Sequence, residues 1–175
     1  MDALDLIRAA YDYNDWANRQ VIAAVEAVGP AQFRASYGAS SFDSLGNTLA
    51  HLLVAEMVWL HRWQHGPARM AQPFDEQRIE LAELRAAWRR HQSQLGSFLM
   101  ALTTRDLAAE VHYQSSAGVQ YAQPLWRIIL HPVNHGTHHR SEVADMLSRS
   151  GARAPWLEMI QFERLSEAER STPAM

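Results

Sequence analysis

The sequence predicts an all-α fold, a four-helix bundle interrupted by one short β-hairpin. Four long segments carry apolar residues at the three- and four-residue spacing of a helix face. The chain shows no alternation of strand and helix patterns and no internal repeat, which argues against an α/β fold. At 175 residues, 47% of them hydrophobic, it is long enough to bury a core as one domain.

The first predicted helix spans 4–28 and ends at the strong stop signal Gly29-Pro30. Asn14 and Asn18 fall in its middle, although asparagine is a weak helix former. We therefore expect their amides to be hydrogen-bonded, in the plainest interpretation because the helix caps or braces a neighbouring loop. The apolar face of this helix is formed by Leu4, Ile7, Tyr11, Val21, Ile22 and Val25.

The second predicted helix spans 45–63 and is apolar nearly all round. Such a helix lies in the middle of a bundle or at an interface. Ser41, Asp43 or Ser44 can serve as its N-cap, because their side chains accept a hydrogen bond from the first helical turn. His51 sits among the apolar residues, so we expect it to be buried.

A loop rich in proline and glycine, 65–76, leads into the third predicted helix, 77–102. One face of this helix is apolar and the other carries charged residues that should be solvated. We place His91 on the charged face. The charged residues are Glu80, Glu83, Arg85, Arg89 and Arg90.

Residues 109–123 alternate around a Ser-Ser-Ala-Gly turn, which predicts a β-hairpin. Pro124 suits the first turn of the fourth helix, where the missing N–H is not needed. Pro132 falls inside that helix and predicts a kink beside His131. Gly151 ends the helix.

The remaining chain divides into a docked segment and a tail. Residues 154–164 include large apolar side chains and should pack onto the bundle in extended or helical form. The last ten residues, 166–175, are predicted to be disordered. The domain is therefore expected to span 1–165.

Composition excludes several classes of function. Net charge is −3, and all 16 basic residues are arginines without a basic patch, so no nucleic-acid partner is expected. The absence of cysteine rules out disulfides, cysteine zinc sites and a cysteine nucleophile. The N-terminus lacks the pattern of a signal peptide, and no apolar run approaches the ~18 residues of a membrane span. We expect a cytoplasmic protein with no membrane partner.

The stretch from His131 to His139 contains four of the nine histidines. On a helix, His135 and His139 lie one turn apart on one face and can hold one metal ion. The third ligand must come from another helix, and His51 is the best candidate because a free imidazole is costly in an apolar stretch. His131 and His135 form a competing pair. His138 is turned about 100° away from His139.

Glu142 is a weak candidate for a catalytic residue. Three residues after His139, it can orient that imidazole by accepting a hydrogen bond, or carry a proton. An ordinary carboxylate on a helix face is the plainer interpretation. The histidines as a group also have a plain alternative, in which they are only hydrogen-bonded in the core of a bundle.

Four stretches together resemble the DinB (damage-inducible) family of the DinB/YfiT-like metalloenzyme superfamily. YNDWANRQV is similar to its opening signature, and NTLAHLLVAEMVWLHRW to its second helix. LHPVNHGTHHRSEV is similar to its histidine-rich run and APWLEMIQFER to its closing segment. Ser141-Glu142 stands where the family usually has Gly-Gln, and Pro132 also departs from the pattern.

The resemblance implies an up-down-down-up four-helix bundle that binds one divalent transition metal ion, nickel or zinc, through His51, His135 and His139. It also implies a homodimer. Relatives of known activity transfer or isomerise groups with low-molecular-weight thiols such as mycothiol or bacillithiol. The leading hypothesis is a metal-dependent enzyme, an S-transferase or isomerase acting on a small-molecule substrate with such a thiol, or a hydrolase using a metal-activated water. The alternative is a non-catalytic metal-binding module of a stress response.

Overall fold

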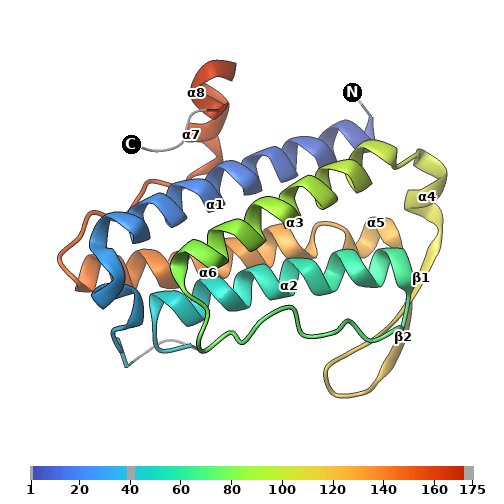
Figure 1. The fold of residues 1–175 in the computed structure, drawn as a ribbon. Helices are drawn as coiled ribbons and strands as arrows, with labels where there is room; N and C mark the ends of the chain where they lie inside the picture. Colours follow the sequence, from blue (N-terminus) through green and yellow to red (C-terminus); the bar gives the residue numbers. More distant parts are fainter. Residues whose placement is uncertain (1, 39–41, 172–175) are drawn as a thin grey trace.

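The structure is a computed structural model that describes residues 2–38 and 42–171. It confirms the mainly helical fold and the bundle. The first and last long helices run in one direction and the two between them run in the other (Figure 1), which is the up-down-down-up connection. The first two long helices each pack against the other three. The four are α1 (Ala3–Arg34), α2 (Leu45–His65), α3 (Leu81–Ala101) and α6 (His131–Arg149).

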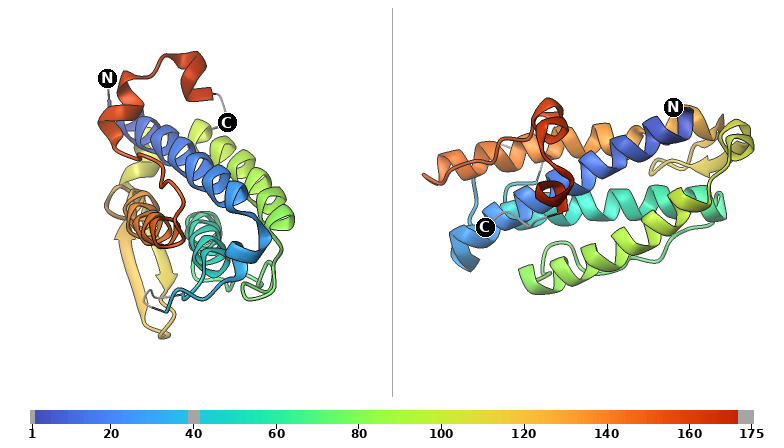
Figure 2. Two further views of the ribbon diagram at one scale, coloured as in Figure 1. Left: turned by 90° about the vertical axis from the view of Figure 1, so that its left-hand side faces the viewer. Right: turned by 90° about the horizontal axis from the view of Figure 1, so that it is seen from above.

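The predicted hairpin is present between α3 and α6. Its strands pair in antiparallel fashion, with Tyr113 opposite Tyr121, and Gly118 supplies the positive φ of the turn. The end view in Figure 2 places the hairpin on the side of the bundle formed by α2 and α6. The shorter elements are α4 (Thr104–Ala108), β1 (Glu110–Gln114), β2 (Gln120–Pro124), α5 (Leu125–Ile128), α7 (Met159–Arg164) and α8 (Glu167–Ser171).

Helix α1 breaks where the stop signal predicts, but it resumes. Gly29 adopts φ 80 and ψ 174, outside the helical region. Pro30 then starts a further stretch of helix that continues to Arg34, because its fixed φ is already helical and a first turn does not need its N–H. The break changes the direction of the chain before it enters α2.

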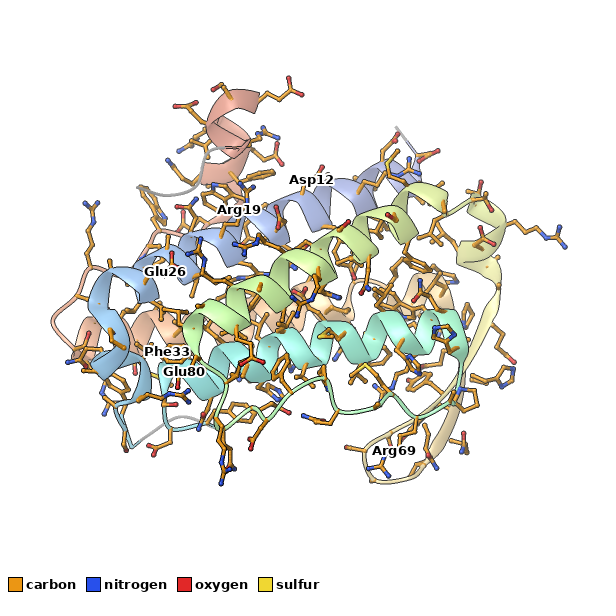
Figure 3. All side chains as sticks on the ribbon, in the orientation of Figure 1. Asp12, Arg19, Glu26, Phe33, Arg69 and Glu80 are labelled. Carbon is orange, nitrogen blue, oxygen red and sulfur yellow. The ribbon has the colours of Figure 1, made fainter. Side chains whose placement is uncertain are left out.

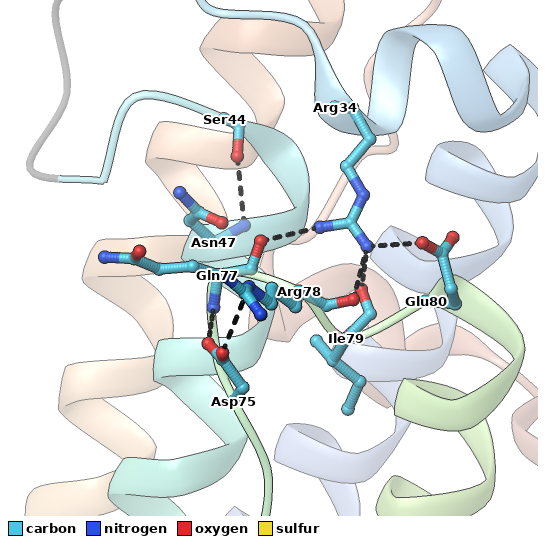
Figure 4. Close-up of polar contacts among 8 residues, drawn as sticks. All are labelled: Arg34, Ser44, Asn47, Asp75, Gln77, Arg78, Ile79 and Glu80. Atoms are coloured by element: carbon cyan, nitrogen blue, oxygen red, sulfur yellow. Dashed lines mark hydrogen bonds and ion pairs between the residues drawn. The ribbon is translucent and has the colours of Figure 1, made fainter.

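Helix α2 begins at one of its three predicted N-caps. The side chain of Ser44 accepts a hydrogen bond from the backbone N–H of Asn47 (Figure 4). Ser41, another candidate, lies outside the described residues. The start of α2 places His51 in its second turn.

The long connection from α2 to α3, residues 66–80, is here called the crossover segment. Its end is held by Arg34, whose guanidinium donates hydrogen bonds to the carbonyls of residues 77–79 and pairs with Glu80 (Figure 4). Those carbonyls accept hydrogen bonds from the side chain of Arg34 on α1 and not from the backbone N–H groups of a helical turn. The predicted start of the third helix at 77 is therefore wrong, and α3 begins at Leu81.

The predicted irregularity beside His131 is present, but the prediction that Pro132 lies inside one continuous helix is wrong. The chain instead ends α5 at Ile128 and starts α6 at His131, so that Pro132 lies in the first turn of a new helix. A proline cannot donate the bond that would join the two helices, and a first turn is where that loss is harmless. His131 and His135 consequently lie at the beginning of α6.

The C-terminal segment packs onto α1. The ring of Phe162 is buried against Tyr13 and Trp16, and the guanidinium of Arg170 lies 4.4 Å from the Phe162 ring centroid. Helix α8 lies within 166–175, and the disorder predicted for that segment stays a prediction. Residues 172–175 of that segment lie outside the described residues.

Among the described residues, two large apolar clusters are separated by a polar layer, and a third, smaller cluster lies where Phe162 packs on α1. One large cluster gathers around α2 residues 45–53 and the other around Leu60 and the start of α6. Each long helix contributes to the layer between them. The layer consists of five buried side chains: Asn14, Asn18, Glu56, His91 and Arg140.

The apolar residues of α2 are explained by packing within one chain. Its leucines from Leu45 to Leu60 are buried against the neighbouring helices. The homodimer stays a prediction. Across residues 2–38 and 42–171, no helix has the length and apolar content needed to cross a membrane.

Candidate metal centre

Two helices bring the three predicted ligands together. His135 and His139 lie one turn apart on α6, and His51 faces them from α2. One ring nitrogen from each residue lies within 4.8 Å of the other two. The ring centroids are 4.3 Å apart for the pair on α6, and 5.3 and 4.9 Å from His51 to His135 and His139. These three residues are here called the histidine cluster.

Glu142 determines which nitrogen of His139 faces the cluster. Its Oε2 lies 2.6 Å from Nδ1 of His139, so Nδ1–H donates to the carboxylate and Nε2 keeps its lone pair. That Nε2 lies 3.1 Å from Nε2 of His135. The predicted orienting role of Glu142 is thus compatible with the geometry.

Two imidazoles of the cluster, those of His51 and His135, are favoured in the neutral form. Burial lowers the pKa of His135 to about 4, with a further contribution from the neighbouring His139 and His51. Burial likewise lowers the pKa of His51, and His139 adds to the effect. Neutral imidazole is the form that binds transition metals.

The spacing of the ring nitrogens fits a metal ion. Two imidazole nitrogens bound tetrahedrally at ~2.05 Å are about 3.4 Å apart. The observed separation between His135 and His139, 3.1 Å, requires only a small rotation of the rings. The donor set of three imidazole nitrogens suits zinc or nickel and is a poor match for magnesium or calcium, which prefer oxygen.

His51 is less buried than predicted. Its side chain is 28% exposed, because it lies on the side of α2 that faces the crossover segment and not the core. Phe42 stacks on its ring with centroids 4.0 Å apart and an interplanar angle of 23°. Nδ1 of His51 lies 3.9 Å from Oε2 of Glu76 in the crossover segment. Phe42 also meets His139 edge-on at 5.5 Å.

The other histidines of α6 lie beside the cluster. The ring of His131 is 5.8 Å from that of His135, and His131 is not among the residues that converge on one point. His138 is exposed, and its Nε2 lies 3.6 Å from Oε1 of Glu142. A second possible set of ligands, His138, His139 and Glu142, therefore lies on the outer face of α6.

The polar layer contains residues that the sequence analysis missed. His91 is 1% exposed, and its Nε2 lies 3.2 Å from Oε2 of Glu56. The prediction that His91 lies on the charged face of α3 is wrong, because its spacing from the buried Trp88 and Leu95 is that of the apolar face. That spacing was visible in the sequence.

Two asparagines connect the charges of the polar layer. Oε1 of Glu56 accepts hydrogen bonds from Nδ2 of Asn14 at 2.8 Å and of Asn18 at 3.1 Å. The side-chain oxygens of the same two asparagines accept hydrogen bonds from Nη1 of Arg140, at 2.7 Å for Asn14 and 2.8 Å for Asn18. The predicted hydrogen bonding of Asn14 and Asn18 is confirmed, but the partners lie on helices α2 and α6 and not in a loop.

Arg140 fixes the rotation of α6 about its axis. Its side chain is 1% exposed and packs over Gly136, where a Cβ would lie 2.6 Å from Nη1 of Arg140. Because neighbouring helix positions differ by about 100°, an inward Arg140 turns His139 and His135 toward α2. The polar layer therefore positions the histidine cluster.

Comparison with known proteins agrees with the fold and the motifs. A sequence model of the DinB family matches residues 3–171. Protein DinB of Bacillus subtilis (strain 168) is 25% identical over 152 residues, which cover 83% of this chain and 87% of that protein. The crystal structure of a DinB-like protein from Bacillus cereus ATCC 10987 has the same fold, with a TM-score of 0.61 at 14% identity over 81% of this chain and 91% of that one. The chain belongs to the DinB family.

Proposed function

We propose that the protein is a metal-dependent enzyme that binds one nickel or zinc ion through His51, His135 and His139. The observation that supports this proposal is the convergence of three imidazole nitrogens within 4.8 Å of one another. A divalent ion held there supplies the Lewis acidity that lowers the pKa of a thiol or a water molecule. We propose a low-molecular-weight thiol as cosubstrate, in a reaction of the S-transferase or isomerase type, with water as the alternative nucleophile.

The side chains around the cluster have distinct roles in this proposal. Three protein ligands leave at least one coordination position for a substrate. Glu142 holds the proton on Nδ1 of His139, so it acts as a positioning residue. Phe42, stacked on His51, covers one side of the cluster with an apolar ring and limits the access of water. Since the chain contains no cysteine, no protein thiol competes for the metal.

A screen of thiol cosubstrates tests the proposal. The metal-loaded protein is incubated with conjugates of mycothiol, bacillithiol and glutathione, and in parallel with esters and amides that report hydrolysis. We expect turnover in one set, lost in His135→Ala and retained in the matched control His112→Ala, which removes an exposed histidine of β1. Metal-loaded protein without turnover in either set would overturn the enzyme and favour a non-catalytic metal-binding module.

A further inference from the structure

A pocket of about 510 Å³ lies between the C-terminal half of α2, the crossover segment and the β-hairpin. Figure 3 labels Arg69 where the crossover segment passes the hairpin. We call this the hairpin pocket. The lining side chains that matter here are Val58, Arg62, Arg69, Gln72, Ser115 and Ser116.

Two arginines in the hairpin pocket lack a carboxylate partner. Arg62 donates a hydrogen bond to the carbonyl of Gln114 at 2.8 Å and lies over the rings of Trp59 and Tyr113 at 4.8 and 5.5 Å. Within the part of the chain that the structure describes, no acidic side chain forms an ion pair with Arg62 or with Arg69. Two unpaired guanidinium groups at one pocket favour an anionic ligand.

In the groove between α1 and α3, by contrast, two arginines are paired with acidic side chains. Arg19 and Arg85, which line that groove, are paired with acids. Arg19 Nε lies 3.1 Å from Asp15, and Arg85 forms an ion pair with Glu26. Among the described residues, Arg89 is the one arginine of that groove without an acidic partner, whereas both arginines of the hairpin pocket lack one, in a protein of net charge −3.

A run of contacts between aromatic side chains leads from Arg62, at the hairpin pocket, to the histidine cluster. The ring of His131 lies 5.8 Å from that of His135 and 4.8 Å from that of Trp59. At the other end of this series of contacts, the guanidinium of Arg62 lies 4.8 Å from the ring centroid of Trp59. Because Arg62 follows His51 by eleven residues, it lies on the same face of α2 and about 16 Å further along the helix.

The crossover segment joins the two places by a second route. Gln72 lines the hairpin pocket and donates a hydrogen bond to Glu76 at 2.9 Å. Glu76 in turn lies 3.9 Å from His51. One edge of the surface between the pocket and the cluster is thus formed by a single run of backbone.

We propose that the hairpin pocket binds the anionic end of an elongated substrate or cosubstrate whose reacting group lies at the histidine cluster. This inference rests on the proposed function. Arg62 and Arg69 bind carboxylate or phosphate oxygens, and the hydroxyl groups of Ser115 and Ser116 add donors at the hairpin turn. Trp59 and His131 contact the body of the molecule. The distance between the two ends selects molecules about 16 Å long.

A nuclear magnetic resonance titration with inorganic phosphate and with succinate tests the pocket and distinguishes the two anions. Backbone amides of residues 115–118 are followed in wild type, Arg69→Gln, Arg62→Gln and the matched control Arg153→Gln, an exposed arginine at the other end of α6. We expect the dissociation constant of the tighter anion to rise about tenfold in each pocket variant and to stay unchanged in the control. Among the residues that the structure describes, Arg69 forms no side-chain hydrogen bond or ion pair and it is exposed, so Arg69→Gln keeps the test valid if Arg62→Gln disturbs the hairpin.

The same variants then separate this inference from the proposed function. In the metal-loaded enzyme, Arg69→Gln should raise KM about tenfold and leave kcat and the metal content unchanged. Absence of anion-induced shifts in wild type, or equal shifts in Arg69→Gln and Arg153→Gln, would overturn the pocket. Anion binding lost in both pocket variants, by a protein that takes up no metal, would support the anion site and refute the metal-dependent enzyme.

Discussion

Replacing Glu56 by alanine removes the carboxylate from the polar layer. Glu56 is 2% exposed and accepts hydrogen bonds from Asn14 and Asn18. Without it, Arg140 and His91 lose the acid that faces them, and two buried amide donors lose their acceptor. Breaking a buried ion pair from one side costs about 3–5 kcal/mol, so Glu56→Ala should lower the free energy of unfolding by that amount.

Glu56→Gln is the matched control, because it removes the charge and keeps the shape. Its amide oxygen still accepts from Asn14 and Asn18, so we expect a loss of about 1–3 kcal/mol. Urea unfolding of the metal-free protein, followed by far-ultraviolet circular dichroism, measures both variants. In a chain of this size each kcal/mol lowers Tm by about 2–4 °C, which predicts a fall of roughly 6–20 °C for alanine.

The pH dependence of unfolding gives an independent readout of the same carboxylate. Burial raises the pKa of Glu56, but His91, Asn14 and Asn18 outweigh it and hold the pKa below the usual 4.5. The stabilisation by Glu56 is therefore present above pH 4.5 and is lost as the pH falls through the pKa of the folded protein. Glu56→Gln should flatten this acidic part of the profile. An alanine variant within 1 kcal/mol of wild type (about fivefold in the unfolding equilibrium constant) would refute the reasoning.

Three further predictions follow from the same region. Gly136→Ala places a Cβ 2.6 Å from Arg140 Nη1 and should lower the free energy of unfolding in urea by about 1–3 kcal/mol. In the control Gly96→Ala, the new Cβ has nothing within 4 Å, and the free energy of unfolding should rise by up to about 1 kcal/mol. Equal effects of the two substitutions would contradict the close packing at Gly136. Glu142→Gln should weaken zinc or nickel affinity about 10–100-fold in calorimetry, since it loosens the hold on His139 Nδ1, and an unchanged affinity would remove Glu142 from the centre. Because burial and neighbouring histidines lower the pKa of His135 to about 4, the unfolded metal-free protein binds the extra proton as the pH falls from 6.5 to 4. Stability should therefore fall over this range by about 1 kcal/mol after allowance for the half-exposed ring, and a His135→Ala profile as steep as that of wild type would contradict this.

Much of the fold was predictable because its signals are local. The spacing of apolar residues predicts the four long helices, Gly29-Pro30 predicts the break in α1, and the turn around Gly118 predicts the hairpin. The pair His135 and His139 is likewise a local signal, since a helix alone brings positions four apart together.

The long-range pairings could not be read in the same way. Glu56 pairs with His91 on a helix 35 positions later, and Arg140 reaches Asn14 across 126 positions. Glu56 was not singled out from the sequence; a charged residue inside an apolar stretch implies a buried partner, but the sequence does not identify which one. Pro132 was ambiguous for a similar reason, because a proline is compatible both with a kink and with the start of a new helix.

The metal content of the purified protein tests the central claim most directly. Elemental analysis after loading with nickel or zinc should find about one equivalent per chain in wild type and in His131→Ala, which leaves the three proposed ligands intact. His135→Ala should contain almost none. Wild-type protein that takes up no metal, with a Tm unchanged by either ion, would contradict the metal centre, and so would a His135→Ala variant that retains a full equivalent.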